Sequence, residues 1–77
     1  MNFSEALTEL RAGQKVRRAL WSSTPMTRAV HVELLEPELA DGRALMPQLL
    51  VQSDDGILRP FSGANWDLLA EDWEVVP

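Results

Sequence analysis

Apolar residues recur at helical spacing near the start of the chain. Positions 3, 6, 7 and 10 are apolar and follow the i, i+3, i+4, i+7 pattern that places them on one helix face. Asn2 is a favoured capping residue, and Glu5 stands where it completes a capping box. Gly13 is typical of the position just beyond a helix end. We therefore predict an amphipathic helix over residues 3–12.

The rest of the chain carries the shorter alternation that is typical of strands. Pro47 confines the start of one strand to a sheet edge or a bulge, and Asp54, Asp55 and Gly56 supply a tight hairpin turn. We predict strands over residues 15–20, 29–36, 44–52, 57–61 and 73–76, with loops at 22–25 and 37–43. Within residues 62–70 a loop leads into a short helical turn, capped by Ser62 or Asn65.

These elements predict an α+β fold in which the N-terminal helix packs on a small antiparallel sheet, with residues 1–77 as a single domain. In the strand over residues 29–36, positions 30, 32 and 34 face one way and positions 31, 33 and 35 face the other. Leucine or valine occurs on both faces of this strand and of the strand over residues 44–52. We expect the helix to cover one face and a second protomer to cover the other.

Length and composition favour self-association. A 77-residue chain has a small core, and it contains no cysteine and one histidine, so a disulfide is impossible and a zinc site is not expected. Oligomerisation is then the remaining source of extra burial. The sequence contains no run of 18 apolar residues, and its start lacks the basic and apolar segments of a signal peptide. We therefore expect a cytoplasmic protein and no membrane partner.

The charge is distributed unevenly along the chain. The net charge is −5 and the pI is about 4.6, which argues against binding a long nucleic acid. Residues 1–28 nevertheless hold five basic and two acidic residues, a net charge of +3, whereas residues 29–77 hold two basic and ten acidic residues, a net charge of −8. The basic segment leaves room for a small anion in a pocket.

The residues that catalysis would need do not form a recognisable set. Nucleophilic catalysis requires a nucleophile and a base, but the only imidazole is His31 and no serine has an obvious base beside it. We interpret His31 as a partly exposed strand residue or an interface contact. The paired carboxylates at 54–55 fit a turn, and Asp72 follows Glu71 where it can bond nearby amides. We predict no catalytic residues, no metal site and no cofactor.

Two clusters could hold a small nucleotide. In the first, Arg17 and Arg18 offer fork-shaped donors that match phosphate oxygens, and Trp21 can stack on a base or support an arginine. Two consecutive strand residues face opposite sides, so at most one arginine would join a given pocket. The alternative for Trp21 is a position in the core.

The second cluster combines aromatic and polar side chains in the segment before the last strand. These are the residue types that form pocket walls and read a base or ribose. The alternative is a capped turn in which Trp66 packs and Asp67 favours the helix start. The cluster adds five candidate ligand contacts: Phe61, Ser62, Asn65, Trp66 and Asp67.

Both ends of the chain resemble a known family. The sequences FSEAL at residues 3–7, GQKVRR at 13–18 followed by Trp21, and DLLAEDWEVV at 67–76 resemble the Thoeris anti-defense protein two family of small phage and prophage proteins. The resemblance covers residues 3–21 and 60–76. Phe61 and Gly63 stand where family members commonly have tryptophan and proline, and Trp66 is unusually bulky for its position. By position, Arg17, Arg18 and Trp21 match the early motif, and Asp67, Ala70, Asp72 and Trp73 match the late one, with Trp73 assigned to the core.

The resemblance implies a non-enzymatic role. Such proteins bind the cyclic ADP-ribose-type signal of the Thoeris system without degrading it, and some relatives sequester the cyclic oligonucleotides of CBASS defense. It also implies a homo-oligomer, usually a tetramer, with ligand pockets between protomers. Two alternatives stay open: a protein-binding inhibitor of a host defense protein, and a hydrolase of the same signal.

Overall fold

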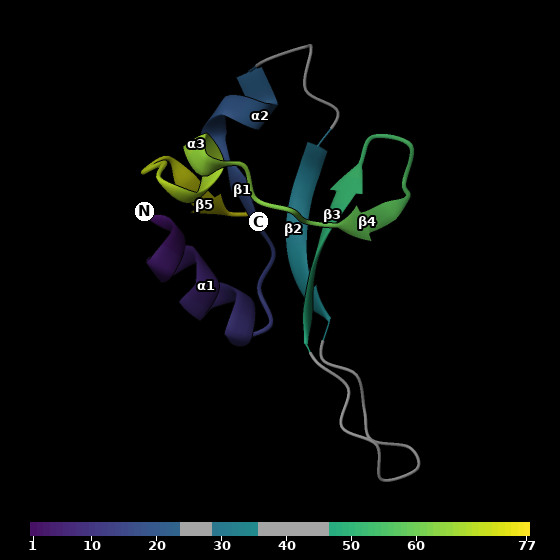
Figure 1. The fold of residues 1–77 in the computed structure, drawn as a ribbon, viewed down its shortest axis with the longest axis horizontal. Helices are drawn as coiled ribbons and strands as arrows, with labels where there is room; N and C mark the ends of the chain where they lie inside the picture. The colour runs from purple at the N-terminus through teal and green to yellow at the C-terminus, as the bar shows by residue number, and fades with distance from the viewer. Residues whose placement is uncertain (24–28, 36–46) are drawn as a thin grey trace, which may run out of the picture.

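The computed structural model describes residues 1–23, 29–35 and 47–77. Every strand pair is antiparallel, and the strands lie in the order β4-β3-β2-β1-β5 (Figure 1). The predicted α+β fold is confirmed, with an N-terminal helix and a short helix before the last strand. The elements are α1 (Phe3–Arg11), β1 (Val16–Arg18), α2 (Ala19–Ser23), β2 (Ala29–Leu35), β3 (Gln48–Ser53), β4 (Leu58–Pro60), α3 (Asn65–Leu68) and β5 (Trp73–Val75). Predictions for residues 24–25, 37–43 and 44–46 lie outside the described residues.

The first helix forms for the local reasons that the sequence contains. The Asn2 side chain accepts a hydrogen bond from the Glu5 amide at 2.9 Å, and the Glu5 carboxylate accepts one from the Asn2 amide at 3.0 Å. This reciprocal capping box satisfies two backbone donors at the helix start. The helix ends at Arg11 with Ala12 as its C-terminal cap, and Gly13 follows with a φ of 90°, a conformation that glycine adopts without steric cost.

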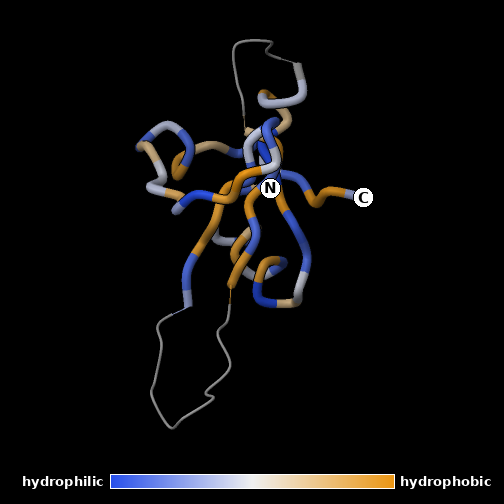
Figure 2. The backbone as a smooth tube through the Cα atoms, turned by 90° about the vertical axis from the view of Figure 1, so that its right-hand side faces the viewer, coloured by the Kyte–Doolittle hydropathy of each residue, from blue (hydrophilic) through white to orange (hydrophobic). Residues whose placement is uncertain are grey.

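The core lies between α1 and one face of the sheet. Hydrophobic segments gather at the centre of the molecule, where the strands run side by side (Figure 2). Trp73 is only 2% exposed and contacts three aromatic rings, with centroid distances of 5.2 Å to Phe3, 5.4 Å to Trp21 and 6.2 Å to Phe61. The assignment of Trp73 to the core is thus confirmed. The fully buried hydrophobic residues are Ala6, Leu10, Val16, Val32 and Trp73.

The hairpin between β3 and β4 also follows local sequence. Gly56 has a φ of 82° and donates its amide to the Ser53 carbonyl at 2.9 Å, while the Asp55 carboxylate accepts the Ile57 amide at 2.9 Å. Aspartate and glycine are the residues that this geometry favours. The predicted turn at residues 54–56 is confirmed.

Both edges of the sheet are partly closed. Pro60, in edge strand β4, has no amide to donate to another strand. On the other edge, the Met1 amino group donates to the Trp73 carbonyl at 2.9 Å and to the Glu71 carbonyl at 3.1 Å, and the Trp73 amide donates to the Met1 carbonyl at 3.0 Å. At the β5 edge these contacts occupy backbone groups that an added strand would need, whereas at the β4 edge Pro60 removes one donor.

The structure corrects the expected strand over residues 15–20. The strand stops at Arg18, and Ala19–Ser23 form the short helix α2, which includes the beginning of the predicted loop. The cause is remote in sequence: the Ala19 amide donates to the Asp72 carbonyl at 2.9 Å, and the Leu20 amide donates to the Asp72 carboxylate at 3.1 Å. These two bonds turn the chain away from the sheet.

Three smaller predictions were also wrong. His31 is only 6% exposed, so the first of its two interpretations, a partly exposed strand residue, is wrong. Val30 is 41% exposed although Val32, predicted on the same face, is buried. A register irregularity between Ala29 and His31 breaks the simple alternation of β2 and accounts for the changed orientation of Val30. The cap of α3 is neither Ser62 nor Asn65, because Ala64 occupies that position without a side-chain hydrogen bond.

Candidate ligand-binding site

The two arginines of β1 extend to opposite faces of the sheet, as their adjacent positions predict. Arg17 pairs across the strands with Glu74, and its Nε lies 2.8 Å from the Glu74 Oε1. Arg18 lies opposite Trp73 in the register, on the face that contacts the core. One face of the sheet therefore holds the half-buried ion pair of Arg17 with Glu74. The other face, which contacts the core, holds Arg18.

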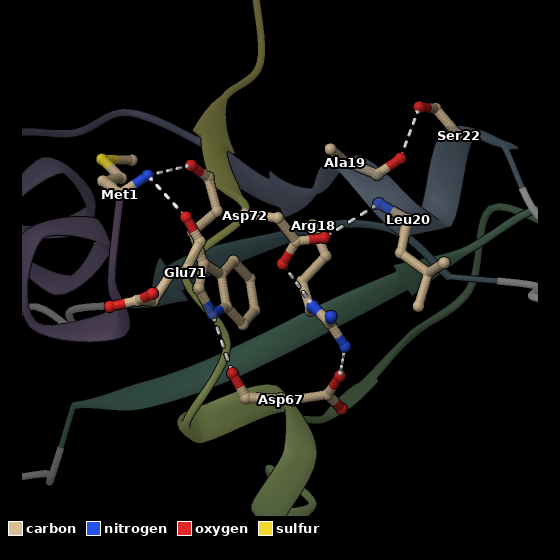
Figure 3. Close-up of polar contacts among 9 residues, drawn as sticks. Met1, Arg18, Ala19, Leu20, Ser22, Asp67, Glu71 and Asp72 are labelled. Atoms are coloured by element: carbon tan, nitrogen blue, oxygen red, sulfur yellow. Dashed lines mark hydrogen bonds and ion pairs between the residues drawn. The ribbon is translucent and has the colours of Figure 1, made fainter.

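Arg18 joins the two segments that precede β5. Its Nε donates to Asp72 Oδ1 and its Nη1 donates to Asp67 Oδ1, each at 2.8 Å (Figure 3). The side chains of Arg18 and Asp67 are 12% and 15% exposed, whereas that of Asp72 is 35% exposed. We call Arg18, Asp67 and Asp72 the arginine clamp.

The contact between Arg18 and Asp72 changes the pKa values of both groups. The hydrogen bond from Arg18 is the largest influence on Asp72 and holds the pKa of that carboxyl below its ordinary value of 3.8. Burial acts in the opposite direction, and the Leu20 amide lowers the pKa further. The same bond to Asp72 is the main reason why the pKa of Arg18 is raised. The ionised forms of both groups are therefore favoured.

Asp67 fixes α3 through its backbone as well as its carboxylate. The indole Nε1 of Trp73 donates to the Asp67 carbonyl at 2.8 Å. Because Trp73 is in the core, this bond and the ion pair with Arg18 attach α3 to the most buried part of the molecule. A helix of only four residues depends on such tertiary contacts for its position.

The structure places the eight predicted contacts in four environments. Arg18 and Asp67 meet in the clamp, while Arg17 lies on the opposite face. Trp21 and Phe61 are half-buried and pack on Trp73 within the core cluster. The exposed contacts are Ser62, Asn65 and Trp66. Trp66 is 73% exposed, so the alternative in which it packs as part of a capped turn is wrong for this chain.

Asp72 is not among the eight ligand contacts that were predicted from the sequence. The prediction that it bonds nearby amides is incomplete, since its carboxylate also accepts the amide of Leu20, 52 positions away. Its presence in the closing motif at residues 67–76 was the available signal. With Asp72 included, one guanidinium faces two carboxylates, and a phosphate at Arg18 would compete with both.

Two further features of the described residues are the grouping of potential metal ligands and the length and polarity of the helices. In residues 1–23, 29–35 and 47–77, histidine, aspartate and glutamate do not gather in a group of three that could hold a metal ion. Within those same ranges, the helices are too short or too polar to cross a bilayer.

The fold and site define a small α+β domain. Its arginine clamp attaches the short helix α3 to the core, and α3 carries the exposed Trp66. The chain belongs to the Tad2-like family, since residues 1–76 match the model of the Thoeris anti-defense 2-like domain. The resemblance identified at the two ends is therefore confirmed, and the match also spans the middle of the chain. This family is an anti-defense domain rather than a known family of enzymes, and it supports a Thoeris anti-defense role. A search of curated proteins finds no match.

Proposed function

We propose that this protein binds a nucleotide-derived immune signal in the cytoplasm of a phage-infected bacterium and sequesters it without degrading it. The proposed ligands are cyclic ADP-ribose-type signals and, as a further class, the cyclic oligonucleotides of CBASS defense. Membership of an anti-defense family supports the role. The observation that carries the ligand class is the exposed indole of Trp66, on a helix attached to the core.

An indole in this position suits a nucleobase. Stacking on an aromatic side chain is worth about 1–3 kcal/mol per base and does not require a particular base. Ser62 and Asn65 are exposed in the same segment and can exchange hydrogen bonds with a base edge or a ribose hydroxyl. We assign Trp66 the stacking contact and Arg18 a positioning role, because its guanidinium already binds two carboxylates.

Phosphate neutralisation in this proposal requires more than one protomer. Arg17 lies on the sheet face opposite Arg18, so it would reach a ligand near α3 only if that ligand lies between two copies. We therefore propose a homo-oligomer, with a tetramer as the expected size. Partly closed sheet edges favour association through faces, and exposed Leu35, Leu58 and Leu69 offer apolar surface for it. Light scattering during size-exclusion chromatography measures the mass, and a monomer would contradict this part.

The function is tested by melting the protein with cyclic ADP-ribose isomers and with cyclic dinucleotides. A ligand that binds the native state raises the melting temperature in a concentration-dependent way. The bound compound is then released by denaturation and identified by mass spectrometry. Recovery of the intact signal supports sequestration, products of cleavage support the hydrolase, and no shift with any of these compounds overturns the proposal.

The stacking contact is tested with Trp66→Ala. We expect affinity to fall about 5- to 150-fold, which corresponds to the loss of one stacked base. Leu69→Ala is a matched control, because Leu69 is an apolar residue adjoining the same helix and is 81% exposed. Equal losses in the two variants would indicate a general apolar surface. Capture of a host protein by a chain that binds no nucleotide would favour the protein-binding inhibitor.

A further inference from the structure

A groove of about 290 Å³ opens between α1 and the β2–β3 hairpin. Leu34 and Leu49 face each other across β2 and β3 in the sheet register and form its floor. The residues that line it are Leu7, Arg11, Leu34, Pro47 and Leu49. Its walls are thus apolar, with one guanidinium as the exception.

This groove is distant from the arginine clamp. Strands β1 and β2 are antiparallel with Val16 opposite Val32. Arg18 therefore lies towards one end of this strand pair and Leu34 towards the other. Figure 1 shows the same separation, with the end of α1 beside the lower parts of β2 and β3 and with α3 near the opposite end. A ligand in the groove would leave the clamp and Trp66 accessible.

Arg11 differs from the other arginines that the structure describes. Arg17, Arg18 and Arg59 each contact a carboxylate. Arg11 is exposed, and within residues 1–23, 29–35 and 47–77 its side chain has no ion-pair or hydrogen-bond partner. It belongs to the last turn of α1, where a cation interacts favourably with the helix dipole, but this interaction leaves its N–H donors available.

Leu7 and Arg11 are placed so that they can act on one ligand. They are four residues apart on α1, so their side chains are neighbours on the same helix face. A molecule lying along this face would contact Leu7 with an apolar part and Arg11 with a polar part. Guanidinium groups bind carboxylates and similar oxyanions through two parallel hydrogen bonds.

We propose that the groove is a binding site for a small amphipathic anion, with an apolar body held by the three leucines and an oxyanion head held by Arg11. The volume is about twice the roughly 150 Å³ that accommodates a benzene ring, so a two-ring body fits. The charge complementarity excludes a cationic occupant, and the apolar lining disfavours a polyphosphate. This site is independent of the proposed nucleotide site.

The test uses two fluorescent probes that differ in charge. Anilinonaphthalene sulfonate carries an anionic head on an aromatic body, and N-phenylnaphthylamine has a similar body without the charge. We expect Arg11→Gln to weaken sulfonate binding about tenfold or more, the effect of losing a hydrogen bond to a charged group, and to leave binding of the neutral probe unchanged. Arg59→Gln is the matched control, because it removes an arginine that lies on edge strand β4, outside the groove.

Methyl NMR of the full chain locates the bound probe. Shifts of the Leu7, Leu34 and Leu49 methyl groups support the groove, whereas shifts confined to exposed Leu68 and Leu69 overturn it. Equal losses in Arg11→Gln and Arg59→Gln, or equal binding of the two probes to the wild type, also overturn it. Thermal melting checks that each variant is folded, since partly unfolded chains bind the sulfonate. Arg11→Lys, which retains the charge, serves as the second variant and is expected to retain most of the binding.

Discussion

The two ends of the β1–β2 strand pair place arginine in opposite environments. At one end, Arg18 is 12% exposed and donates to Asp67 and Asp72. At the other, Arg11 is exposed at the rim of an apolar groove and has no partner within the described ranges. The first arginine holds parts of the chain together, and the second is available to a molecule from outside.

This difference could not be inferred from the order of charges. The basic segment over residues 1–28 suggested that its arginines neutralise phosphates, but the fold brings acidic residues to it. Lys15 lies 3.8 Å from Glu33, and Arg17 lies 2.8 Å from Glu74. Much of the positive charge that the segment carries is thereby paired inside the molecule. Among the described residues 1–23, 29–35 and 47–77, Arg11 is the arginine whose guanidinium has no carboxylate partner.

The largest expected effect comes from replacing each arginine by methionine, which removes the charge and keeps an apolar chain. Arg18→Met leaves the little-exposed carboxylate of Asp67 and the partly exposed carboxylate of Asp72 without their cation, and we expect it to lower the free energy of unfolding by about 3 kcal/mol. Arg11→Met removes an unpaired surface charge and should change it by less than about 0.5 kcal/mol. Urea denaturation of the three proteins measures both changes.

A triple variant tests the same clamp further. Arg18→Met combined with Asp67→Asn and Asp72→Asn removes the uncompensated negative charges, so stability should recover in part. If Arg18→Met were as mild as Arg11→Met, the clamp would have no structural role. The distinction between the two ends of the strand pair would then be lost.

The elements that were predicted correctly depend on contacts between close neighbours in sequence. The capping box joins Asn2 to Glu5, and the hairpin turn joins Ser53 to Gly56. The start of α2 depends instead on Asp72, which is more than 50 residues away. No local pattern contains that contact, so the C-terminal end of the strand was predicted two residues too late. The burial of His31 likewise depends on the packing around an irregular strand.

In the candidate site, too, residue types could be predicted from the sequence, but contacts between distant residues could not. The sequence identified Arg18, Asp67 and Trp66 by residue type and motif, and the structure places the first two in direct contact. It could not distinguish an arginine that binds ligand from one that binds carboxylates, because this depends on where Asp72 lies. Nor could it show that Trp66 is exposed while Trp21 and Phe61 pack on Trp73. Exposure is a property of the assembled fold.

A second prediction concerns acid. The pKa of Asp72 is lower in the folded protein than its ordinary value of 3.8, chiefly because of Arg18. A lowered carboxyl pKa contributes stability that is fully present above the unfolded value and is lost as the pH falls through the folded value. We expect the wild type to lose stability below about pH 4 more steeply than Asp72→Asn does. Urea denaturation at pH values from about 7 to about 2 measures the two curves.

The groove supplies the control for this pH dependence. Arg11→Met leaves the clamp intact, so its curve should run parallel to that of the wild type at every pH. Arg18→Met removes the main cause of the shift, so its curve should flatten in the same range as that of Asp72→Asn. A steep acid transition that persists in both clamp variants would place the responsible carboxyl groups elsewhere.

The smallest expected effect is the response of ion pairs to salt. The coupling energy of Arg18 with Asp72 should depend on salt less than that of the exposed pair of Arg59 with Asp55. Double-mutant cycles measure the coupling of Arg18 to Asp72 and that of Arg59 to Asp55, whose side chains are 49% and 28% exposed. The exposed pair should contribute less than about 1 kcal/mol, and most of this should disappear between about 0.1 M and about 1 M salt. The Arg18 coupling should decline less, because a guanidinium that is 12% exposed is poorly accessible to counterions. Equal salt sensitivity in the two cycles would mean that the clamp is solvated like a surface pair, and Arg18 would then be as available to an external phosphate as Arg11.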